Sequence, residues 1–168
     1  AIEVGDLDAN GSIEIYATPS EPFRLDGAEQ AGHVTRYVPA ENGARSVVAD
    51  LGDRHAKEIL VRDVDGDGVD ELYVAVEAKT EGSGPATRIV EPVAILRFDA
   101  GTDPKARNVI ATLDDRLTRF LTAGDIDGDG ESDPDEHVVF GRVDEGGDDA
   151  DELAIAVHER AATVAGID

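Results

Sequence analysis

An internal repeat constrains the fold of this chain more than any other feature of its sequence. The segment 44–68, ARSVVADLGDRHAKEILVRDVDGDG, aligns without a gap on 106–130, ARNVIATLDDRLTRFLTAGDIDGDG, and 12 of the 25 positions are identical. A shorter match of 34–37 (VTRY) with 95–98 (ILRF) extends the alignment upstream with a slip of one residue. Self-similarity at a fixed spacing indicates a chain built from repeated supersecondary units.

Each full unit contains four short apolar stretches that are rich in β-branched residues and bounded by Gly, Pro, Asp or Asn, which is typical of strands. No stretch sustains a helical period. The predicted strands are 13–17, 34–38, 47–51 and 59–61 in the first full unit, and 72–76, 93–98, 109–113 and 120–123 in the second. The stretch LYVAV at 72–76 is apolar throughout, so we expect it to be buried on both faces.

Four strands per unit predict an all-β fold with β-propeller-type blades of four antiparallel strands. Another stacked β-repeat is the alternative. We expect one repeat domain over 1–168, with the end of one unit at 1–5, full units at 6–62 and 63–124, and a partial unit at 125–168. This number of units predicts a partial propeller.

An acidic loop precedes the first strand of each unit, and the loop DVDGDGVDE at 63–71 is the clearest. Four of its five carboxylates occupy loop positions 1, 3, 5 and 9, so alternate side chains can converge on one point, and Gly66 and Gly68 allow the backbone to curl with positive φ. The carbonyl of Val69 at position 7 supplies another oxygen. Several hard oxygen ligands suit Ca²⁺, and without a cation these carboxylates would repel one another. The predicted ligands are Asp63, Asp65, Asp67, Val69 and Glu71.

Two further loops have the same layout, so we expect about three Ca²⁺ sites and no other cofactor. Asn10 replaces a charged ligand in the first loop, which predicts a weaker site there. The third loop ends ambiguously: Asp133, Glu136 or Glu152 can complete it, the last if a hairpin is inserted before the true strand. The acidic stretch 144–152 is a solvated loop or a degenerate site. The predicted ligands are Asp6, Asp8, Asn10, Ser12 and Glu14 in the first loop, and Asp125, Asp127, Asp129, Glu131 and Asp133 in the third.

Two other interpretations of the loops are weaker. Asp and Gly are common in ordinary turns, but three copies in register with a repeat are hard to explain in that way. An EF-hand loop also begins D-x-D-x-D-G, but its glutamate at position 12 is replaced by Ala17 in the first loop and Val74 in the second. Strands, not amphipathic helices, are predicted after both loops.

Charge and composition narrow the range of functions that this chain can have. The chain carries 38 acidic and 15 basic residues, a net charge of -23, which argues against binding to nucleic acid and to anionic membrane surfaces. It contains no Cys, so disulfides and thiolate chemistry are absent. No apolar run approaches the length needed to span a membrane. The four His do not pair at ligand spacing, and no candidate catalytic group breaks the repeat symmetry, so we expect no enzymatic activity.

The pattern RDVDGDGVDELYVAV resembles the FG-GAP/VCBS repeats, which are found in integrin α-subunit propellers and in many exported bacterial proteins. The resemblance implies Ca²⁺ bound between strands of a blade. It also implies a secreted, extracellular or periplasmic module with a structural role or with adhesion-type binding to protein or glycan. Part of a propeller-type enzyme acting on polysaccharide is the alternative. Further blades of a longer parent chain or a protein partner are the expected partners. Departures from the pattern are Asn10, the late end of the third loop and the small number of units.

Overall fold

The computed structural model describes residues 1–19, 23–113, 120–124, 137–141 and 155–157. These residues form thirteen β-strands and two single-turn 3-10 helices, Pro39–Glu41 and Gly84–Ala86. The predicted all-β fold is therefore confirmed. Within these ranges, no helix is long and apolar enough to cross a membrane.

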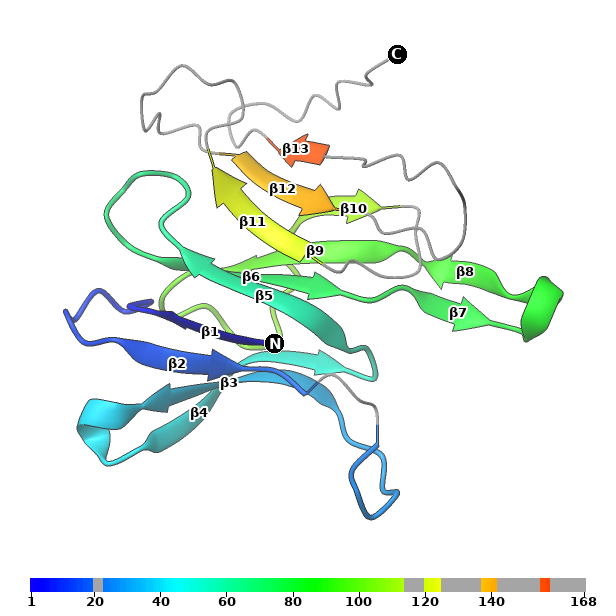
Figure 1. The fold of residues 1–168 in the computed structure, drawn as a ribbon, viewed down its shortest axis with the longest axis horizontal. Coiled ribbons are helices and arrows are strands. Elements are labelled where there is room, and N and C mark those ends of the chain that lie inside the picture. The colour runs from blue at the N-terminus through cyan, green and yellow to red at the C-terminus, as the bar shows by residue number, and fades with distance from the viewer. Residues whose placement is uncertain (20–22, 114–119, 125–136, 142–154, 158–168) are drawn as a thin grey trace.

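The strands form two four-stranded antiparallel sheets, one shorter sheet and a separate hairpin (Figure 1). The first sheet has the order β1 (Ile2–Gly5), β2 (Glu14–Ala17), β3 (Gly32–Val38), β4 (Ala44–Gly52). The second sheet has the order β5 (Ala56–Arg62), β6 (Glu71–Val76), β9 (Val93–Phe98), β10 (Val109–Leu113). The third sheet contains β11 (Phe120–Gly124), β12 (His137–Gly141) and β13 (Ile155–Val157), and the hairpin pairs β7 (Lys79–Glu81) with β8 (Arg88–Glu91).

The sheets repeat one topology, but they are out of phase with the predicted units by one strand. The predicted strand 59–61 lies in β5, which pairs with β6 across an acidic loop and so opens the second sheet. In the same way, the predicted strand 120–123 lies in β11 and opens the third sheet. The physical reason is that a short loop between antiparallel strands keeps them adjacent as a hairpin, so each acidic loop joins two strands of one sheet.

The sheets stack face to face, with the second sheet between the first and the third (Figure 1). One face of the second sheet packs against Tyr16, Val34, Ala49 and Leu51 of the first sheet. Its other face packs against β11, which contributes Leu121 and Ala123. All six residues of β6 are buried, which confirms that LYVAV is covered on both faces. Across the described residues the sheets do not close into a ring.

The third sheet bears on the ambiguous end of the third loop. In it β12 pairs with β11, and β13 then pairs with β12. His137–Gly141 thus takes the place that β6 has in the second sheet, and Ile155–Val157 takes the place of β9. The pairing of β12 with β11 makes His137–Gly141 the first described strand after the loop, and Asp133, Glu136 and Glu152 themselves lie outside the described residues.

Gly32, at the start of β3, lies directly against the segment that links the first sheet to the second. A Cβ atom at this position would lie 1.8 Å from the carbonyl oxygen of Arg54 and 3.1 Å from the Cα of His55. The linker cannot move away freely, because the Arg54 side chain donates to the carbonyls of Glu77 and Pro92. The absence of a side chain at Gly32 therefore permits the close contact of the two segments.

We expect Gly32→Ala to lower the free energy of unfolding by about 3 kcal/mol, at the upper end of ordinary overpacking, because backbone must shift. Gly27→Ala is the matched control, since a Cβ there meets nothing within 4 Å although φ is 79°. It should cost about 1 kcal/mol through backbone strain alone. Urea denaturation of both variants in calcium measures the two values. Equal losses would show that the Arg54 contact is not a tight one.

Candidate metal centre

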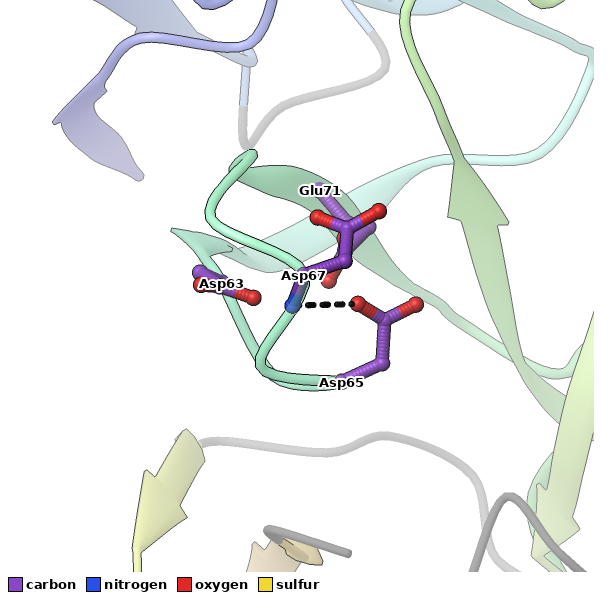
Figure 2. A group of neighbouring side chains, drawn as sticks. All are labelled: Asp63, Asp65, Asp67 and Glu71. Carbon is purple, nitrogen blue, oxygen red and sulfur yellow. Dashed lines mark hydrogen bonds between the residues drawn. The ribbon is translucent and has the colours of Figure 1, made fainter. Parts of the chain in front are cut away.

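Four carboxylates converge in the loop 63–70, between β5 and β6, and at the first residue of β6. Asp63, Asp65, Asp67 and Glu71 each offer an oxygen, and these oxygens all lie within 4.8 Å of one another (Figure 2). The convergence of the four side chains matches the sequence prediction. An arrangement that gathers several carboxylate oxygens around one point can hold a metal ion.

Backbone amides of the same loop donate to all four carboxylates, three of which are aspartates. The amide of Gly68 donates to Asp63 Oδ2 at 2.8 Å, and the amide of Val69 donates to Asp67 Oδ1 at 2.8 Å. The amide of Asp67 donates to Asp65 Oδ1 at 3.3 Å (Figure 2). Gly66 and Gly68 have φ values of 72° and 89°, as predicted. The loop therefore holds its carboxylates in place through its own backbone.

One oxygen of this cluster has no partner within the described part of the chain. Asp63 Oδ1 is buried and makes no hydrogen bond, although Asp63 Oδ2 accepts from Gly68. A buried carboxylate oxygen without a donor is costly. A cation at the centre of the cluster would satisfy it, so the donor set fits a bound metal ion.

Glu71 differs from the three aspartates because it lies in the core. It is 2% exposed, and its Oε2 accepts from the amide of Val64 and the hydroxyl of Tyr73, both at 3.1 Å. Burial raises the pKa of the Glu71 carboxyl to about 7, although the Val64 amide and the Arg97 guanidinium favour its charged form. Its negative charge therefore depends on nearby positive groups.

Arg97, on the neighbouring strand β9, is the functional residue that the sequence analysis missed. Its Nη2 lies 2.7 Å from Asp65 Oδ2 and 3.5 Å from Glu71 Oε1, and its Nε donates to Asp99 Oδ1 at 2.6 Å. The guanidinium bridges positions 3 and 9 of the loop. The signal was present in the repeat, because Arg36 of VTRY aligns with Arg97 of ILRF.

The first loop, between β1 and β2, repeats this design with fewer charges. Asp6, Asp8 and Glu14 offer oxygens that all lie within 4.8 Å of one another. Glu14 is fully buried and accepts from the hydroxyl of Tyr16 at 2.7 Å, as Glu71 does from Tyr73. Arg36 Nη2 contacts both Asp8 and Glu14. The two loops are thus equivalent in the carboxylates at positions 1, 3 and 9, in their tyrosine and in their arginine.

The two loops differ at position 1. The amides of Asn10 and Gly11 donate to the two oxygens of Asp6, at 2.9 and 2.7 Å, so both oxygens are engaged. The corresponding oxygen of Asp63 has no donor. Asp6 also donates its own amide to Asp70 Oδ2 of the second loop at 2.7 Å. The first loop therefore has fewer free carboxylate oxygens, and the weaker site expected there stays a prediction.

The remaining predicted ligands stand as follows. Asn10 Oδ1 accepts from the amide of Ser12 at 2.8 Å, which places both residues in the turn of the first loop. Ligand roles for Asn10, Ser12 and the carbonyl of Val69 stay predictions. The third loop lies outside the described residues, with Asp125, Asp127, Asp129, Glu131 and Asp133, and so do Glu136, Glu152 and 144–152.

Fold and site together define the class of this protein. It is an antiparallel β-repeat protein in which acidic loops of the first two sheets form repeat-equivalent clusters that can hold a metal ion. Comparison with protein-family models, with curated proteins and with solved structures finds no match. The function must therefore be argued from the residues of the loops themselves.

Proposed function

We propose that this chain is a calcium-binding β-repeat module of propeller type, exported from the cell, with a structural or partner-binding role and no catalytic one. The main observation in support of this proposal is the cluster of carboxylates in the second loop. Four carboxylates converge there, and the buried Asp63 Oδ1 has no donor from the described residues. A divalent cation bound at this point accounts for both facts.

The chemistry of the donors favours Ca²⁺. The second loop combines carboxylates, and backbone carbonyls near them, in a loop whose glycines allow irregular geometry. Ca²⁺ accepts six to eight oxygen ligands in flexible arrangements, whereas Mg²⁺ demands a near-ideal octahedron and retains water. Cys is absent from the whole chain, and neither described cluster contains His, so the ligands preferred by most transition metals are missing from them.

The arginines bear on where such a module works. Arg36 and Arg97 each place a positive charge beside two carboxylates of a cluster, which opposes the entry of a cation. The resulting sites should be weak. Extracellular calcium modules bind with dissociation constants of about 10⁻⁴–10⁻³ M. Weak sites of this kind are filled where calcium is plentiful, which supports the proposal of an exported protein.

Calorimetric titration tests the proposal. We expect heat of binding with Ca²⁺ and much weaker binding with Mg²⁺. Asp67→Ala should weaken calcium binding by at least about tenfold, or 1.4 kcal/mol, because it removes a charged ligand. Asn10→Ala should weaken it less, because the amide carries no charge.

Asp26→Ala is the matched control for Asp67→Ala. Asp26 accepts from the amide of Ala28, two residues on, just as Asp67 accepts from Val69. The control therefore removes one negative charge and one turn hydrogen bond away from either cluster. Equal effects of Asp26→Ala and Asp67→Ala would mean that only net charge matters. Absence of calcium binding to the unmodified chain would refute the proposed function.

A further inference from the structure

The first sheet has one face against which no other described sheet packs. We use the name outer face for the block of positions on this face that are paired across β1, β2 and β3; it is turned away from the second sheet. The register brings its members side by side, since Val4 pairs with Ile15, and Ile15 pairs with Tyr37. Ile2 is 72% exposed, Val4 56% and Ile15 38%. The members of the outer face are Ile2, Val4, Ile15, Ala17, Thr35 and Tyr37.

This composition is unusual for the surface of this protein. The chain contains 38 acidic residues, yet none of the six outer-face positions carries a carboxylate. Soluble proteins rarely leave contiguous apolar surface open without a function for it. A charged group that borders it is Arg45, whose guanidinium lies 4.8 Å from the centre of the Tyr37 ring.

The repeat shows what such a face contacts. The register of the second sheet assigns each outer-face residue a counterpart, because Leu72 pairs with Phe98 as Ile15 pairs with Tyr37. The counterparts face the first sheet, and every one is at most 7% exposed. They are covered by Tyr16, Val34, Ala49 and Leu51 of the first sheet. The counterparts are Ile59, Val61, Leu72, Val74, Leu96 and Phe98.

The same comparison sets the limit of the interface. Val47 of β4 pairs with Thr35 and lies beside the outer face, 47% exposed. Its counterpart, Val109 of β10, is 48% exposed although the second sheet is covered on this side. The edge strand of the second sheet therefore lies outside its contact with the first sheet at this position. By the same comparison, Val47 should lie outside any contact that the outer face makes.

An open hollow of about 590 Å³ lies on the outer face. Four outer-face residues line it, and it extends past them to Thr18, which is 7% exposed and whose Oγ1 lacks a hydrogen-bond partner among the described residues. The full lining is Ala1, Ile2, Ala17, Thr18, Pro19, Gln30, His33, Thr35 and Tyr37. At the corresponding place on the second sheet, side chains of the first sheet fill the space. The hollow therefore has the form of a socket for side chains of another sheet.

We propose that the outer face binds a further sheet of the same repeat, and that a second copy of this chain supplies that sheet in solution. The sheet must present apolar side chains like those of Tyr16, Val34 and Leu51, because these cover the equivalent surface in the observed pair. Among the described sheets, the first and the third lie at the two ends of the stack (Figure 1). The contact is therefore head to tail, in which two different surfaces meet. This inference does not depend on a metal ion.

Sedimentation velocity over a wide concentration range tests the inference. We expect the unmodified chain to associate, and Ile15→Glu to weaken the association at least tenfold by placing a charge inside the contact. Val47→Glu adds the same charge to the same sheet and should change the association less than twofold. Because each copy carries a charge of -23, association should strengthen with added salt, which screens the repulsion. Contacts made by ion pairs would weaken instead.

A second measurement avoids reliance on a glutamate variant that fails to fold. The chain has no Cys, so Ile15→Cys introduces a unique thiol on a smaller, uncharged side chain. Its reaction with a maleimide should be fast in dilute solution and should slow as unmodified chain is added. A monomer at every concentration, or association that Ile15→Glu leaves unchanged, would overturn the inference. Calcium titration of the same variants keeps this outcome separate from failure of the proposed metal sites.

Discussion

Chelation of calcium is expected to lower the melting temperature of this protein by roughly 10–20 °C. Only the folded chain brings the carboxylates of each cluster together, so ion binding is linked to folding. At free Ca²⁺ about 100-fold above Kd, each site adds roughly 2.7 kcal/mol. In a chain of this size each kcal/mol shifts the melting temperature by roughly 2–4 °C, and two clusters are described.

Differential scanning calorimetry in calcium and in chelator measures this shift. Mg²⁺ at the same concentration should recover little of it. Asp63→Ala should reduce the shift by removing the ligand with the unpartnered oxygen, whereas Asp26→Ala should leave it unchanged. A melting temperature that is the same in calcium and in chelator would show that folding does not depend on an ion in either loop.

The second large effect concerns Arg97. We expect Arg97→Gln to cost about 3 kcal/mol in chelator, because Glu71 is buried and a buried ion pair that loses one partner leaves an uncompensated charge. The cost should be much smaller in saturating calcium, because the ion neutralises the same carboxylates. The stabilisation by calcium should therefore be larger in the variant than in the unmodified chain.

Chemical denaturation in both conditions gives the four values required. Arg88→Gln is the matched control, since Arg88 pairs with Glu81 at 2.9 Å on the surface, with both side chains more than half exposed. Exposed ion pairs contribute little, so this variant should respond equally to calcium and to chelator. If Arg97→Gln has the same cost in both conditions, the arginine and the cation do not act on the same carboxylates.

The sequence was sufficient to predict most strands of the first two sheets and the convergence of the loop carboxylates. Strands with many β-branched residues, such as β6, are decided by local composition, and the tight acidic loops are decided by Asp and Gly at fixed spacing. The composition of the strands and the spacing of Asp and Gly in the loops point to the same arrangement, because each loop and its flanking strands are close in the chain. Both features can therefore be predicted without knowledge of long-range contacts.

The sequence was not sufficient where the decisive contact is distant. Arg97 is 32 residues from Asp65, and a strand arginine has many possible partners until the register is known. The phase of the sheets depends on which of two flanking strands pairs across a loop, which composition does not reveal. The β7–β8 hairpin was missed because its strands, Lys79–Glu81 and Arg88–Glu91, are short, exposed and charged.

The offset of one strand between sequence units and sheets has a consequence for how such chains are lengthened or recombined. A cut at the start of an acidic loop, before Asp63 for example, separates β5 from β6 and breaks a sheet. A cut within 53–55 passes between whole sheets and leaves each loop with both of its strands. Viable exchanges of modules should therefore have their junctions in these short linkers, although the sequence similarity runs through them without a break.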